Sequence, residues 1–195
     1  MRVIINESQL FEIIKGEYNE LKTKIKPIVG SGAEHRIFVS KRDPNIIYKI
    51  GSINVVKKWY EIFKKYPDFF PKVYKIGITN VPIITEPDGK YRMAYVAIEK
   101  LDTETFEKNW NIFDEYFDYN MSDIIITSLS TDFVFDQLVS AGEMIRQNEG
   151  EEMYLKYKEI IDLCVNINKV IYKSLDVHIY NFGYDRNGKL KCLDI

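Results

Sequence analysis

The chain has 195 residues, of which 46% are hydrophobic and 14% aromatic, so its composition excludes a disordered segment and suits one domain or two small lobes. Its formal net charge of −2 gives no reason to expect a nucleic-acid partner. The two cysteines, Cys164 and Cys192, do not form a CxxC pair, which argues against a zinc site or a disulfide framework. The sequence lacks a signal-peptide pattern and a run of about 18 apolar residues, so we expect no membrane partner and a cytoplasmic location.

The first hundred residues are expected to form one helix and then a β-rich region. Apolar residues recur at helical spacing over residues 7–23, and the period then shortens to that of strands. An Asp-Pro-Asn turn at residues 43–45 separates the apolar runs 37–40 and 45–50, which we expect to pair as a hairpin. The elements expected next are a helix from about Ile53 to Lys65 and strands over residues 70–77 and 91–101.

The second half of the chain is expected to be helical and to end in a hairpin. The hairpin turn is expected at Asp185 to Gly188, between two short strand-like runs. The helices predicted from the period of the apolar residues cover residues 103–119, 131–148 and 151–173. We therefore predict an α+β fold with an N-terminal helical segment over residues 1–27, a β-rich lobe over residues 28–101 and a helical lobe over residues 102–195.

Two features of the β-rich lobe are candidates for binding or catalysis. Gly30-Ser31-Gly32 lies between two expected strands, where its backbone N–H groups would bind a phosphate or form an ordinary turn. Lys49 lies two positions after Ile47 in a strand-like run, so both side chains should face the same side of the sheet, toward the core. A buried ammonium needs a partner, and Glu61 on the following helix is the partner we expect. The alternative is that Lys49 points into solvent.

The C-terminal region supplies a third feature, a set of oxygen-bearing side chains at fixed spacing. Asn181 follows Asp176 by five positions, and Asp194 follows Asn181 by thirteen, across the expected hairpin. Carboxylate and amide oxygens are the ligands that Mg²⁺ prefers, and a carboxylate outside the metal shell is able to accept the proton of an attacking hydroxyl. The alternative is that these residues belong only to a turn and a helix end.

Taken together, the motifs resemble those of the protein-kinase-like superfamily, in particular its small bacterial, phage-type and aminoglycoside-phosphotransferase-like members. GSGAEHRIF is similar to the glycine-rich loop, IIYKI to the strand with the phosphate-binding lysine, and WYEIF to the helix that supplies a glutamate. AIEKL is similar to the end of the hinge strand, DVHIYN to the catalytic loop and CLDI to the strand that ends in a metal-binding aspartate. The resemblance extends from about Val29 to the last residue.

The resemblance implies a role for each of the charged and amide residues. Lys49 would hold the α- and β-phosphates of ATP, with Glu61 fixing the lysine. Asp176 would be the catalytic base, and Asn181 with Asp194 would bind Mg²⁺. The implied fold is a two-lobed kinase-like fold with a β-rich N-lobe and a reduced helical C-lobe.

The resemblance also implies how the rest of the nucleotide would be bound. Gly30 and Gly32 would approach its phosphates through their backbone. The backbone of Glu99 and Leu101 would meet the adenine edge, with Ile98 at the gatekeeper position.

Several positions depart from the family pattern. His35 stands where the loop has its third glycine, and Ser174 replaces the usual histidine two residues before the catalytic aspartate. His178 lies two residues after Asp176, as in several small-molecule kinases of this superfamily, and we expect it to support the loop. The sequence continues only one residue past Asp194, without an activation segment, so we expect no familiar docking platform for a protein substrate.

Two functions follow as hypotheses. The first is a minimal kinase-fold protein that binds Mg²⁺ and ATP and transfers the γ-phosphoryl group to an unidentified hydroxyl acceptor. The alternative is a catalytically inactive pseudokinase that acts as a structural or interaction module for a protein partner, and the short end, His35 and Ser174 favour it. A phage origin would fit such a reduced domain. This alternative expects an exposed aromatic face on the helix over residues 103–119, made of Phe106, Trp110, Phe113 and Phe117.

Overall fold

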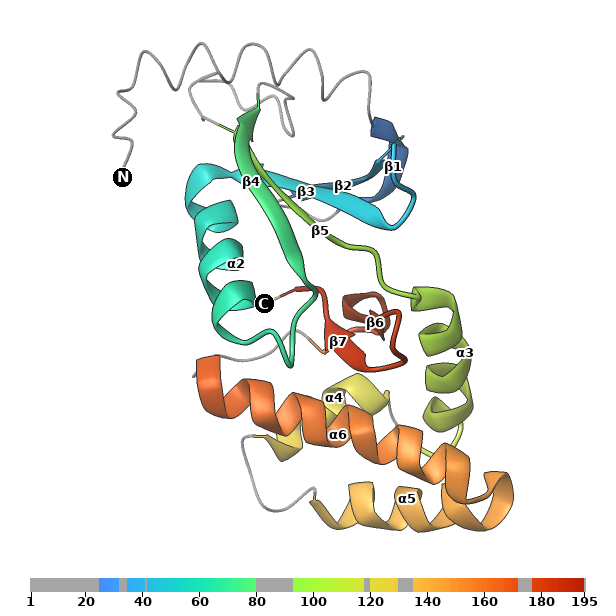
Figure 1. The fold of residues 1–195 in the computed structure, drawn as a ribbon. Coiled ribbons are helices and arrows are strands. Elements are labelled where there is room, and N and C mark those ends of the chain that lie inside the picture. Colours follow the sequence, from blue (N-terminus) through green and yellow to red (C-terminus); the bar gives the residue numbers. More distant parts are fainter. Residues whose placement is uncertain are drawn as a thin grey trace. The chain divides into compact units, whose positions relative to one another are not determined.

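The structure is a computed structural model that describes residues 25–31, 35–40, 42–79, 93–117, 120–129, 135–171 and 177–194. It confirms an α+β fold (Figure 1). The chain divides into two compact units. The first unit contains Met1–Pro67 and Lys72–Lys100, and the second contains Asp68–Pro71 and Leu101–Ile195. The helix expected over residues 7–23 lies outside the described residues.

A five-stranded antiparallel sheet forms the first unit, in the order β1-β2-β3-β5-β4 (Figure 1). The expected hairpin is confirmed, because β2 and β3 pair with Ile37 opposite Lys49. On its other side β3, the central strand of the sheet, pairs with β5, and Lys49 of β3 lies opposite Val96 of β5. The strands are β1 (Ile25–Ser31), β2 (His35–Ser40), β3 (Ile46–Ser52), β4 (Val73–Thr79) and β5 (Met93–Glu99).

One helix, α2 (Ile53–Lys65), connects β3 to β4 and confirms the expectation for this segment. Its first turn is capped by the Ser52 side chain, which accepts a hydrogen bond from the Val55 N–H at 3.4 Å. The helix buries one face, formed by Val56, Trp59 and Phe63 at helical spacing, and contacts β3, β4 and β5. This face, together with the buried β5 side chains, forms the core of the first unit.

The second unit consists of helices and a short hairpin. The longest of these helices are joined by a single residue, and α5 packs against α6. The expected helix over residues 103–119 ends earlier, at Asp114, and helices are observed within the other two expected ranges. The helices are α3 (Thr103–Asp114), α4 (Met121–Ser128), α5 (Phe135–Glu149) and α6 (Glu151–Ile171). No helix in the described ranges is long and apolar enough to cross a membrane.

The helix α4 was absent from the sequence-based expectation. Its consecutive β-branched residues favour a strand, yet the Asn120 side chain accepts a hydrogen bond from the Ser122 N–H at 2.8 Å and starts a helix. Burial of Met121, Ile124 and Ile125 then offsets the weak helical propensity of the isoleucines.

The prediction of an exposed aromatic face on residues 103–119 is wrong. Phe106 and Phe113 are completely buried and Trp110 is 4% exposed, while Phe117 is only partly exposed. The Phe106 ring lies 5.5 Å from the ring of Phe182, measured between centroids, so this face packs against the C-terminal hairpin. The aromatic residues are the core of the second unit and not an interaction surface.

The expected C-terminal hairpin is confirmed as β6 (Phe182–Tyr184) paired with β7 (Leu190–Cys192). Its turn is held by the Asp185 carboxylate, which accepts hydrogen bonds from the N–H groups of Asn187 and Lys189, both at 2.9 Å. Gly188 has a φ of 77°, a conformation that glycine adopts without strain.

Candidate functional site

The Lys49 side chain lies in the core of the first unit. It is 1% exposed, so the alternative of a strand lysine in solvent is wrong. Its ammonium nitrogen lies 4.0 Å from the centroid of the Trp59 indole ring, on the buried face of α2. A cation at this distance over an indole is attracted by the negative face of the ring.

Glu61, the expected partner of Lys49, occupies a different part of α2. Two helical positions separate it from Trp59, which is a rotation of about 200° around the helix axis. The glutamate is exposed, whereas Trp59 is 2% exposed. The structure therefore brings Trp59, and not Glu61, to the Lys49 ammonium. The signal was present in the sequence, since the apolar period of α2 includes position 59 and leaves out position 61.

The residues proposed to meet an adenine ring lie at the end of β5 and just after it. Ile98 is completely buried and pairs with Ile47 of β3. The N–H of Glu99 donates a hydrogen bond to the Lys72 carbonyl oxygen at 2.9 Å. Leu101 belongs to the second unit and is 3% exposed.

The glycine-rich segment is described in part. Gly30 belongs to β1 and pairs with Ile37 of β2. Gly32 lies outside the described residues, so the structure does not test a phosphate-binding role for this loop.

The C-terminal hairpin places the backbones of the two expected metal ligands close together. Asn181 is the last residue of a short 3-10 helix, η2 (Ile179–Asn181), directly before β6. Its carbonyl oxygen accepts a hydrogen bond from the Leu193 N–H at 2.7 Å, which places Asp194 one residue beyond the paired position. The Cys192 thiol donates to the Asp194 carbonyl oxygen at 2.8 Å and further constrains the backbone there.

The donor chemistry of this pair suits a hard divalent cation. Among the residues that the structure describes, no group of three or more His, Cys, Asp or Glu side chains is placed to hold a metal ion. Mg²⁺, however, is usually bound by one or two protein oxygens and completed by phosphates and water. One amide and one carboxylate, held on neighbouring backbone positions, therefore fit Mg²⁺ better than a metal that needs a complete protein cage.

The loop that precedes Asn181 is described from Val177 onward, so Asp176 and Ser174 lie outside the described residues. Val177 is 2% exposed and anchors the loop in the core of the second unit. The exposed His178 accepts a hydrogen bond from the Tyr180 N–H through Nδ1 at 3.4 Å, and the two rings lie 5.1 Å apart. His178 thus caps η2 locally.

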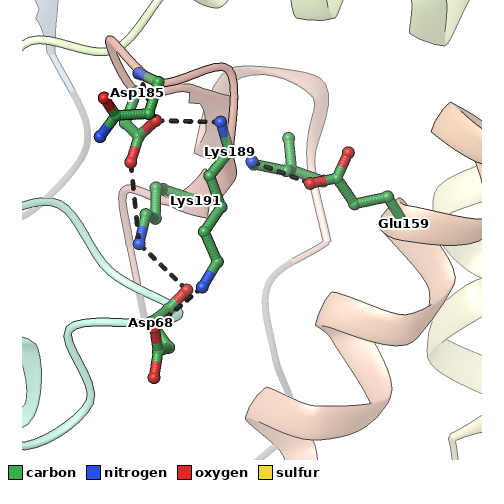
Figure 2. A network of polar contacts seen from close by, with 7 residues as sticks. Asp68, Glu159, Asp185, Lys189 and Lys191 are labelled. Carbon is green, nitrogen blue, oxygen red and sulfur yellow. Dashed lines mark hydrogen bonds and ion pairs between the residues drawn. The ribbon is translucent and has the colours of Figure 1, made fainter.

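A second buried lysine, Lys191 of β7, lies in a polar network that the sequence did not reveal (Figure 2). Its ammonium donates a hydrogen bond to the Asp68 carbonyl oxygen at 3.1 Å and lies 4.0 Å from the Asp185 carboxylate. The neighbouring Lys189 forms an exposed ion pair with the Asp68 carboxylate at 2.8 Å. The hydrogen bond from Lys189 and the positive charge of Lys189 hold the pKa of Asp68 below its ordinary value.

The same network fixes the strand that leads to Asp194. The Cys192 N–H donates to the Phe69 carbonyl oxygen at 2.8 Å. The Leu190 N–H donates to the Glu159 carboxylate of α6 at 3.0 Å (Figure 2). Three successive residues of β7 are therefore held by segments distant in sequence. This strand is a rigid support for the residues that follow it.

A scan against protein-family models and a search of curated proteins found no match to this chain. The assignment of a function therefore depends on the residues themselves. The residues to consider are the buried Lys49, which contacts Trp59 in the first unit, and Asn181 and Asp194, whose backbones lie close together in the second.

Proposed function

We propose that this chain is a minimal protein-kinase-like protein that binds ATP with Mg²⁺ and transfers the γ-phosphoryl group to a hydroxyl acceptor. The observation that carries the proposal is the position of the buried Lys49 on β3, which is the third strand and the central one of the sheet. A buried ammonium is costly, and a protein retains one where it serves a structural network or binds an anion. Protein kinases bind the phosphates of ATP through a lysine on the third strand, and Lys49 lies on β3.

The order of elements gives further support. In protein kinases the helix named αC contributes the partner of the phosphate-binding lysine. Here α2 follows β3 directly and contacts it, and one of its buried side chains lies against Lys49. The sheet is antiparallel throughout, and its third strand is central.

Asn181 and Asp194 are the residues that would hold Mg²⁺. When bound with ATP, the ion would neutralise the charge that develops on the β- and γ-phosphate oxygens. Lys49 would pair with the α- and β-phosphates as a fixed positive charge. Asp176 would orient the acceptor hydroxyl and take its proton.

Calorimetric titration with ATP, in the presence and absence of Mg²⁺, tests the binding step. We expect binding that depends on Mg²⁺ and that is lost in Asp194→Ala. Asp162→Ala is the matched control, because it removes an exposed carboxylate of α6 in the same unit. Failure of the unmodified protein to bind ATP at millimolar concentration, or unchanged binding by Asp194→Ala, would contradict the proposal.

The transfer step is tested with water as the acceptor. We expect slow Mg²⁺-dependent release of ADP, and we expect Asp176→Asn to lower kcat by about a hundredfold or more while the affinity for ATP stays unchanged. Nucleotide binding without any release of ADP would leave a binding protein and would overturn the transfer step. The burial of Phe106 and Phe113 removes the aromatic surface through which the pseudokinase alternative was expected to act.

A further inference from the structure

A stripe of side chains runs along the outer side of α6 at alternating spacings of four and three residues. This period keeps its members on one face of the helix and is typical of the seam between two packed helices. All of them are exposed except Val165, which is partly exposed, and Leu155 is 56% exposed. The stripe consists of Glu151, Leu155, Lys158, Asp162, Val165 and Lys169.

The order of residues in this stripe is complementary to its own reverse. When two copies of one helix pack antiparallel about a two-fold axis, residues equally far from the axis on its two sides lie opposite each other. An axis at position 160, midway along the stripe, places Lys158 of one copy opposite Asp162 of the other. The same axis places Leu155 opposite Val165. Opposite charges and apolar side chains therefore meet in one register.

The outer pair of the stripe follows the same rule. Glu151 and Lys169 are each nine positions from the axis and would also meet as opposite charges. Glu151 already forms an ion pair at 2.8 Å with Arg146 of its own chain, so the inner pairs carry the argument. Parallel packing would instead place each charge beside the same charge of the other copy, which is unfavourable. The stripe therefore favours an antiparallel second copy.

A groove beside the stripe offers a place for the exposed leucine. A pocket of about 340 Å³ opens between α5 and α6, which lie side by side (Figure 1). Gly142 allows this close approach, because a β-carbon there would lie 3.1 Å from the ring of Tyr157. Val165 lines the pocket, so Leu155 of an antiparallel copy would lie at its mouth. The other aliphatic residues of the lining are Leu138, Val139 and Ile161.

We propose that this chain forms a two-fold symmetric dimer through α5 and α6, in which the α6 helices are antiparallel and Leu155 of each copy enters the groove of the other. The occupant is a second copy, because the charges and the apolar residues of the stripe match their own reversed order. This surface contains none of the residues to which the proposed function assigns a role. Dimerisation is therefore independent of that function, and Asp162→Ala keeps its purpose as a control for nucleotide binding.

Sedimentation equilibrium of the intact chain tests the dimer. We expect a mass twice the 23.0 kDa of one chain, and we expect Leu155→Lys to weaken association by about a hundredfold or more, since each dimer loses two buried leucines. Met144→Lys is the matched control. Met144 is 43% exposed, and it lies two positions from Gly142, a rotation of about 200° around α5 away from the groove. This control should leave association unchanged.

Exchange of the inner charges tests the antiparallel register. Lys158→Asp places two carboxylates on the stripe of each copy, and Asp162→Lys places two ammonium groups there, so each variant alone should associate at least about tenfold more weakly. An equimolar mixture of the two variants restores both opposite-charge pairs and should dimerise again. Both positions are exposed, so we expect these variants to fold, and circular dichroism checks this.

Three results would overturn the inference. The first is an unmodified protein that stays monomeric at roughly millimolar concentration. The second is a dimer that Leu155→Lys leaves intact, or that Met144→Lys weakens as much, because the contact would then lie on another surface. The third is a mixture of the two charge variants that stays monomeric, because the two α6 helices would then not meet in the antiparallel register.

Discussion

Each unit of the molecule contains a buried lysine, and the surroundings of the two differ. Lys191 in the second unit is 5% exposed, and its ammonium contacts the Asp68 carbonyl oxygen and the Asp185 carboxylate. Lys49 in the first unit is 1% exposed, and its ammonium lies against the indole of Trp59. Burial alone therefore does not identify a functional lysine.

The two lysines differ more informatively in the kinds of atoms that contact their ammonium groups. Oxygen ligands around Lys191 offset the cost of its burial and tie together segments more than a hundred residues apart, which is a structural role. The contacts of the Lys49 ammonium include an aromatic ring, whose negative face attracts it. The network around Lys191 predicts a loss of stability on mutation of that lysine, and the proposed function predicts a loss of anion binding on mutation of Lys49.

The largest effect on stability is expected from Lys191→Met. The change leaves the Asp185 carboxylate, whose side chain is 11% exposed, without its nearby ammonium, and we expect a loss of about 2 to 3 kcal/mol in the free energy of unfolding. Urea denaturation measures this loss. Lys49→Met is the matched comparison and should cost less, because methionine fills the space without a buried charge. A larger loss for Lys49→Met would break the distinction between the two lysines.

A smaller effect is expected from Asp185→Asn. Asparagine keeps an oxygen that is able to accept the turn hydrogen bonds from Asn187 and Lys189 but removes the charge near Lys191, so we expect a loss of about 1 kcal/mol. A double-mutant cycle with Lys191→Met measures the coupling. The loss from Lys191→Met should be smaller in the Asp185→Asn background. Strict additivity would show that the two side chains do not act as a pair.

The smallest effect is expected from Lys189→Met, although this lysine makes the shorter ion pair. The pair is exposed, so water and salt screen it. Its hydrogen bond to Asp68 lowers the pKa of that carboxyl, so its contribution is present above the unfolded value of 3.8 and is lost as the pH falls through the lower folded pKa.

Urea midpoints of the unmodified protein and Lys189→Met should therefore differ slightly at neutral pH and converge in acid. Added salt should reduce the difference at neutral pH. A difference that grows as the pH falls would contradict the sign of the Asp68 shift. A loss as large as that of Lys191→Met would mean that burial does not separate the two lysines of β7.

Much of the fold was predictable because its signals are local. The turn at residues 43–45 and the turn at Asp185 to Gly188 both correctly predicted hairpins, and the apolar period correctly predicted α2. The burial of Lys49 was one of two alternatives for a lysine two positions after Ile47 in a strand, and the structure decides between them. These features depend on residues a few positions apart.

Features that depend on tertiary contacts were missed. The helix α4 was missed because burial overrides the strand propensity of its isoleucines. The network around Lys191 was missed because its partner Asp68 is 123 positions away. The resemblance to kinases directed attention to Glu61, although the period of α2 favours Trp59 as the buried residue.

The central claim is that the buried Lys49 binds the phosphates of a nucleotide, and titration of Lys49→Met with Mg²⁺-ATP tests it most directly. Circular dichroism and urea denaturation would first establish that the variant is folded. We predict that the unmodified protein binds Mg²⁺-ATP and that folded Lys49→Met loses at least about tenfold in affinity, as expected for the loss of a charge-assisted contact to phosphate. Equal affinity of the two proteins would contradict the account.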